Sequence, residues 1–77
     1  MKFIPYVGED GKTNYFDAHA VQFTMAFQIG PVDEHGKVQQ WGTKVAFNTP
    51  NHGYIISKEP SDVLIKRIEE ANGLVSD

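Results

Sequence analysis

The sequence contains no cysteine among its 77 residues. A disulfide framework, a thiolate metal site and a cysteine nucleophile are therefore excluded. Because small secreted domains depend on disulfides, we expect a reducing compartment and a cytoplasmic location. The sequence also lacks a run of about 20 apolar residues, and no apolar signal-peptide core follows Met1, so neither a membrane partner nor secretion is predicted.

The sequence also lacks a large excess of positive or negative charge. Seven Lys and Arg residues stand against ten Asp and Glu residues, which gives a formal net charge of −3. Proteins that bind nucleic acid usually carry a basic face, because each phosphate contact releases counterions. The basic residues of this chain are scattered, at Lys2, Lys12, Lys37, Lys44, Lys58, Lys66 and Arg67. We therefore expect no nucleic-acid partner.

The length and composition predict one small globular domain. Hydrophobic residues make up 40% of the chain and charged residues 22%, which is ordinary for a folded protein. A chain of this size hides roughly 60% of its unfolded surface, enough for one thin core but not for two domains. We expect residues 1–77 to form a single domain that is ordered over about residues 2–74.

The strongest strand signal lies in residues 21–29. Large apolar side chains occupy every odd position, and the even positions hold only Gln, Thr and Ala. Alternation with a period of two is typical of a half-buried strand. We expect the odd side chains to be buried and the even ones to form a flat, uncharged outer surface. Such a surface and an open strand edge favour pairing with another chain, so a homo-oligomer is predicted.

Turn residues separate further strands, which are predicted at residues 2–7, 13–16, 38–47 and 54–57. Pro5 places the first of these at a sheet edge, because proline has no amide hydrogen to donate. Gly42, inside a long strand, predicts a bulge or a twist.

A single helix is predicted near the C-terminus. Pro60 fits its first turn, and Asn72-Gly73 supplies the left-handed residue that ends a helix. The apolar residues Leu64, Ile68 and Ala71 follow helical spacing, with Ile65 widening the stripe, and Leu74 is expected to fold back on the helix. The fold class is therefore α+β: a four- to five-stranded antiparallel meander sheet with one C-terminal helix packed on one face.

Side chains capable of catalysis or metal binding are present but dispersed. The three histidines lie in separate predicted turns, whereas metal ligands converge on one point. The sequence has no nucleophile motif and no glycine-rich phosphate loop. We expect that the protein is not an enzyme and that it binds no cofactor. The alternative hypothesis is a small-ligand or metal-binding domain that uses the turn residues Asp17, His19, Asp33, His35 and His52.

Nine of the 77 residues are aromatic, and two interpretations of them stay open. In one, Phe23, Phe27, Phe47 and Trp41 form the core under the helix. In the other, Trp41 forms an aromatic patch with Tyr6, Tyr15 and Tyr54 on the second face or the edge of the sheet, and such a patch marks a protein interface. The leading hypothesis is a small non-catalytic intracellular protein-binding module, an adaptor, regulator or inhibitor, that acts through an exposed sheet edge and an aromatic patch. Its candidate partner-binding residues are Trp41, Asp33, Glu34, His35, Tyr6 and Tyr54.

The order of elements resembles that of the small FlbD-like proteins of bacterial flagellar operons. The resemblance covers most of residues 2–72: an opening strand, a glycine turn before Tyr15-Phe16, paired strands, then Tyr54–Ser57 and a closing helix at Ser61–Ile68. The segment 30–42 is longer than in that family. The resemblance implies the architecture and does not specify an activity.

Overall fold

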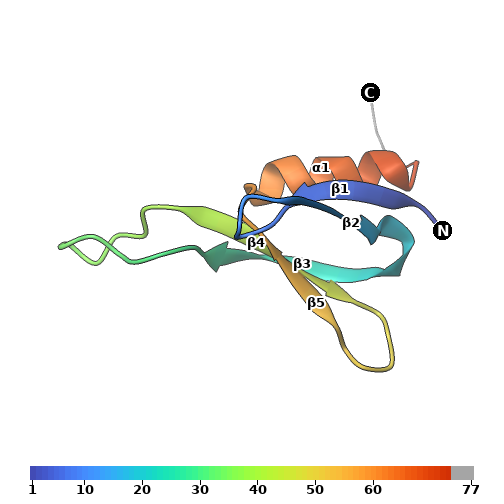
Figure 1. The fold of residues 1–77 in the computed structure, drawn as a ribbon, viewed down its shortest axis with the longest axis horizontal. Helices are drawn as coiled ribbons and strands as arrows, with labels where there is room; N and C mark the ends of the chain where they lie inside the picture. Colours follow the sequence, from blue (N-terminus) through green and yellow to red (C-terminus); the bar gives the residue numbers. More distant parts are fainter. Residues whose placement is uncertain (74–77) are drawn as a thin grey trace.

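A computed structural model describes residues 1–73 of the chain. Its elements follow in the order β1 (Phe3–Val7), β2 (Thr13–Asp17), a short 3₁₀ turn η1 (Ala18–Ala20), β3 (Val21–Gln28), β4 (Trp41–Phe47), β5 (Tyr54–Ser57) and α1 (Ser61–Ala71). The α+β class and the C-terminal helix are thus confirmed. Figure 1 shows α1 beside the β1–β2 hairpin, with the longer strands below them.

The five strands form two antiparallel sheets rather than the single meander that we expected. β1 pairs with β2, and the larger sheet has the order β3-β4-β5. The sheets meet at one corner, where Gly8 bridges Ser57 and the Lys58 amide donates to the Val7 carbonyl oxygen over 3.0 Å. Only the ends of β1 and β5 overlap, because the chain turns at Gly8 and leaves β5 to begin the helix.

The hydrophobic core lies between the helix, the β1–β2 hairpin and the inner face of the larger sheet. Leu64 of α1 and Val45 of β4 are fully buried, each with a relative exposure of 0%. The cluster consists of Ile4, Phe16, Ala18, Val45, Leu64 and Ile68. The predicted stripe of Leu64 and Ile68 is confirmed, whereas Ile65 is exposed. Because β4 is the central strand of its sheet, its register decides which residues of β3 face this core.

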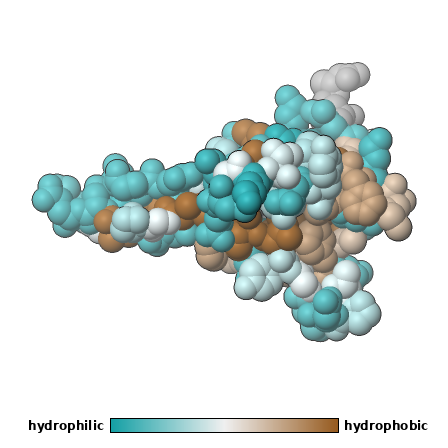
Figure 2. Space-filling view, viewed as in Figure 1, coloured by the Kyte–Doolittle hydropathy of each residue, from teal (hydrophilic) through white to brown (hydrophobic). Residues whose placement is uncertain are grey.

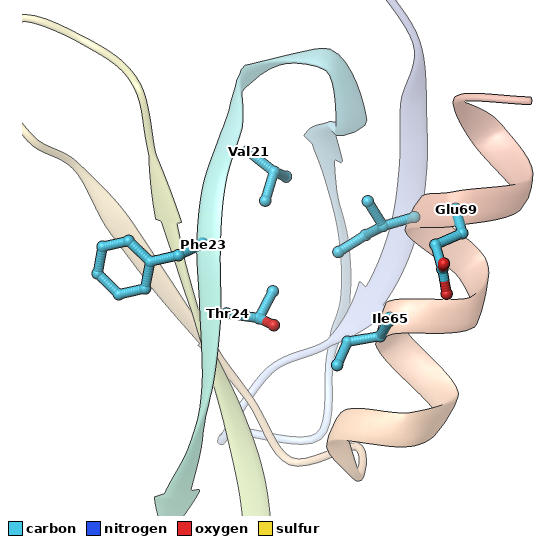
Figure 3. A pocket seen from close by; sticks show the side chains of 6 residues that line it. Val21, Phe23, Thr24, Ile65 and Glu69 are labelled. Atoms are coloured by element: carbon cyan, nitrogen blue, oxygen red, sulfur yellow. The ribbon is translucent and has the colours of Figure 1, made fainter. Parts of the chain in front are cut away.

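The expected burial of β3 is wrong. Phe23 and Met25 are each 49% exposed and Phe27 is 36% exposed. Val21 pairs with Phe47 and Phe23 with Ala46, so a bulge between Val21 and Phe23 breaks the alternation. Val21 therefore lies on the core side, and the following odd residues lie on the opposite side. The even residue Thr24, expected outside, points toward the helix (Figure 3).

The strand predicted at 38–47 begins only at Trp41, and residues 29–40 form a long arm between β3 and β4 (Figure 1). Of the bulge or twist predicted at Gly42, the bulge lies instead in β3, between Val21 and Phe23. Gly42 is buried and packs closely: a Cβ atom there would clash with the Ser57 carbonyl oxygen. Glycine at this position thus lets β4 and β5 approach each other.

The helix ends as the sequence predicts. Gly73 has a φ of 71°, and its amide donates to the Glu70 carbonyl oxygen over 3.2 Å. The predicted contact of Leu74 lies outside the described residues. Within residues 1–73, no helix has the length and apolar character needed to cross a membrane.

Candidate interaction surface on β3

The side of the larger sheet that faces away from α1 carries an apolar surface. Antiparallel pairing places side chains of three strands in rows across it: Phe23, Ala46 and Tyr54 form one row, and Met25, Lys44 and Ile56 form the next. Phe27 extends the surface along β3, opposite Gly42. We call this surface the outer face, with the residues Phe23, Met25, Phe27, Lys44, Ala46, Tyr54 and Ile56.

The outer face is mainly apolar, and its large side chains on β3 and at Tyr54 are exposed, whereas Ala46 between them is buried. Tyr54 is 58% exposed, in addition to the exposed side chains of β3. Its only charged residue is Lys44, whose ammonium group lies 4.3 Å from the centroid of the Tyr54 ring. A cation over an aromatic face is favourable and keeps the charge against the protein. Contiguous exposed apolar surface of this kind marks interaction sites in small proteins.

β3 is also an open edge of its sheet. It pairs with β4 on one side, and no other strand among residues 1–73 pairs with its second side. The Ile29 amide donates to the Gln40 carbonyl oxygen over 3.0 Å. Because the bonding direction alternates along an antiparallel strand, the odd residues of the regular part of β3 bond to β4. The even residues Thr24, Ala26 and Gln28 therefore present their N–H and C=O groups outward.

A shallow pocket lies between β3 and α1. Its volume is about 180 Å³, and it is lined by Val21, Phe23, Thr24, Ile65, Ile68 and Glu69. Figure 3 shows Val21 and Thr24 on the helix side of β3 and Phe23 on the other side. The pocket is mainly apolar, with Thr24 and Glu69 as its polar lining residues, and it adds apolar surface next to the β3 edge.

The acidic loop predicted to bind a partner lies at the arm of residues 29–40. The Asp33 carboxylate accepts hydrogen bonds from the amides of His35 and Lys37, at 2.9 and 2.8 Å, so it closes the turn. Glu34 and His35 are both exposed, and their side chains approach to 3.7 Å. In Figure 2 the arm is mainly hydrophilic, whereas apolar surface is concentrated on the body of the molecule.

The aromatic residues predicted for the site are not gathered in one place. Tyr54 lies on the outer face. Trp41 is 53% exposed and pairs with Gln28 at the far end of β3. Tyr6 is half-buried and packs against Phe16, with ring centroids 5.6 Å apart.

Of the four aromatic residues considered for the core, Phe47 contacts it, with its ring centroid 5.7 Å from that of Phe16. Phe23, Phe27 and Trp41 do not belong to the core, and their assignment to it is wrong. Phe16, which that interpretation omitted, is buried instead. The signal that identifies it is its place in a short strand whose partner residue, Ile4, is also apolar.

The turn residues of the alternative hypothesis do not converge on one point, and the carboxylates of Asp17 and Asp33 accept hydrogen bonds from backbone amides. The Asp17 carboxylate accepts from the amides of Lys2 and His19, each at 3.0 Å. The hydrogen bond from Lys2 lowers the pKa of the Asp17 carboxyl. Within residues 1–73, no three His, Asp or Glu side chains lie close enough to hold a metal ion together.

Glu59 has the most hydrogen-bond partners of any carboxylate in residues 1–73, and its contacts stabilise the fold. It accepts from both terminal nitrogens of Arg67, at 3.0 and 2.8 Å, and from the Val7 amide at 2.9 Å. The hydrogen bond from Arg67 lowers the pKa of the Glu59 carboxyl, and the same contact raises the pKa of Arg67. This ion pair connects β1, the end of β5 and α1.

Comparison of the chain with protein-family models, curated proteins and solved structures gives no match. The resemblance to FlbD-like proteins therefore stays a prediction.

Proposed function

We propose that this chain is a small non-catalytic protein-binding module that acts through the open edge of β3 and the adjoining outer face. The observation that supports this most is the combination of outward backbone groups with exposed Phe23, Met25 and Phe27 on one strand. An added strand gains main-chain hydrogen bonds at an open edge, and alternate side chains give it specificity.

The positions of the polar residues agree with a non-catalytic role. Asp17 and Asp33 hold turns, and Glu59 holds an ion pair that joins three elements. These carboxylates are therefore engaged in backbone and ion-pair contacts. We place the proposed module in the cytoplasm, because a chain without cysteine suits a reducing compartment.

The test compares the proteins that an immobilised chain retains from a lysate of its native host. Ala26→Pro removes an outward amide and leaves the bonds to β4 in place, so it should reduce specific retention by about tenfold or more. Phe27→Lys should act in the same direction by adding charge to the outer face.

Tyr15→Ser is the matched control, because Tyr15 is an exposed aromatic residue on β2, outside the proposed surface. Circular dichroism confirms that each variant is folded. If Ala26→Pro, Phe27→Lys and Tyr15→Ser retain the same proteins in the same amounts as the unmodified chain, the proposed surface is wrong.

A further inference from the structure

The amino-acid sequence of the exposed strand β3 is nearly the same in both directions. Residues 22–28 have the sequence Gln-Phe-Thr-Met-Ala-Phe-Gln, with Met25 at the centre. Reversal exchanges Gln22 with Gln28 and Phe23 with Phe27, and only the small residues Thr24 and Ala26 differ. A strand that opposes its own copy in an antiparallel pair meets the reversed sequence, so this segment is chemically matched to itself.

From this symmetry and the open edge we infer that the partner of β3 is the β3 strand of a second copy, paired antiparallel about a two-fold axis at Met25. The inference rests on the proposed function and names its partner. A two-fold interface uses the same patch on both subunits, and each contact away from the axis occurs twice. The two three-stranded sheets would then join into one continuous sheet.

The direction of the backbone groups fits this register. Around Met25, Thr24 of one copy lies opposite Ala26 of the other, and both residues present their N–H and C=O groups outward. Each such pair exchanges both backbone hydrogen bonds. A centre between two residues would instead oppose an outward residue to one that is bonded to β4, and it would place the outer face of one copy beside the inner face of the other.

The side chains fit the same register. Met25 lies opposite Met25 of the second copy and Phe23 opposite Phe27, all on the outer face. These are non-hydrogen-bonded pairs, in which side chains approach most closely, and aromatic pairs across strands are favourable.

Charge does not oppose the association, and the interface is small. No Asp, Glu, Lys or Arg occurs from Ala20 to Val32, so the paired strands bring no like charges together. Protein interfaces of standard size bury about 1,200–2,000 Å² in total. One pair of short strands covers less than this, and we expect a dimer that dissociates in the micromolar range.

Cysteine cross-linking tests the register directly, because the natural chain has no cysteine. Opposed Cα atoms of a non-hydrogen-bonded pair lie about 4.5 Å apart, within the usual disulfide range of about 4.4–6.8 Å. Met25→Cys should therefore form covalent dimers under mild oxidation. Tyr15→Cys, exposed on β2, is the control and should remain mainly monomeric.

A mixture of variants fixes the centre of the pairing. Phe23→Cys and Phe27→Cys mixed together should give a cross-linked dimer of the two variants, and either variant alone should give several-fold less. The inference is overturned if Met25→Cys cross-links no more than Tyr15→Cys, or if Phe23→Cys alone cross-links as well as the mixture does.

Sedimentation equilibrium of the unmodified chain separates this inference from the proposed function. The apparent mass should rise with concentration, and Ala26→Pro should abolish the rise. A chain that is monomeric throughout overturns the second copy as partner. The proposed function then still stands if retention from a lysate depends on Ala26, and falls if that dependence is also absent.

Discussion

The Glu59 side chain connects β1, the end of β5 and α1 through a hydrogen bond from the Val7 amide and an ion pair with Arg67. It is only 16% exposed, and both of its carboxylate oxygens accept from Arg67. Arg67 also donates to the Pro5 carbonyl oxygen over 2.8 Å. Removing the carboxylate would leave the guanidinium and the Val7 amide without their charged partner.

We predict that Glu59→Gln lowers the free energy of unfolding by about 2 kcal/mol at neutral pH, because hydrogen bonds to charged groups contribute more than neutral ones. Urea denaturation measures the change. Glu70→Gln, at an exposed helix position, is the control and should change stability by less than about 0.5 kcal/mol.

The effect of Glu59→Gln should depend on pH. The pKa of the Glu59 carboxyl is lower in the folded protein than its ordinary value of 4.5. Its contribution to stability is therefore fully present above pH 4.5 and is lost as the pH falls through the folded pKa. The stability difference between the two proteins should shrink as the pH falls from about 7 to about 3. A constant difference across this range would contradict the role given to the ion pair.

Substitution of Trp41 tests whether this residue belongs to the core or to the surface. Because its side chain is 53% exposed, Trp41→Ala should change the free energy of unfolding by less than about 1 kcal/mol. A thermal melt followed by circular dichroism checks this. Loss of the folded state would contradict the surface position and indicate that Trp41 belongs to the core. If the protein stays folded, the separate hypothesis that Trp41 binds a partner is testable by the same lysate retention.

At the scale of elements, the close approach of β4 and β5 depends on Gly42. We predict that Gly42→Ala destabilises the protein by about 3 kcal/mol, because the added Cβ would meet the Ser57 backbone oxygen, which cannot move independently of β5. Gly53→Ala is the control, since its nearest neighbour would lie at an ordinary 3.6 Å. Chemical denaturation of both variants gives the comparison, and equal stabilities would contradict this packing.

The existence of the elements could be predicted from the sequence, but the buried face of β3 could not. Alternation in residues 21–29 indicates a strand correctly, because period two depends only on the extended backbone. It does not indicate which face meets the core, since that depends on the pairing with β4 and on a bulge of one residue. The helix was easier to predict because its apolar stripe and its glycine end are local features.

At the scale of the whole molecule, the position of the candidate surface follows from the shape of the core. One helix of 11 residues and the β1–β2 hairpin cover a single face of the larger sheet. On the other face Phe23, Met25, Phe27 and Tyr54 stay exposed, and the edge of β3 stays open. The general idea of an exposed edge and an aromatic patch could be proposed from the sequence. Five of the six named residues, however, lie away from the outer face that the fold creates: Trp41, Asp33, Glu34, His35 and Tyr6.

Amide hydrogen exchange of β3, followed by nuclear magnetic resonance, tests the central claim most directly. At high dilution the amides of Thr24 and Ala26 should exchange much faster than those of Met25 and Phe27, because only the latter bond to β4. When a partner occupies the edge, or when the protein concentration is raised, Thr24 and Ala26 should become protected. Equal protection of all four amides at high dilution would contradict the open edge.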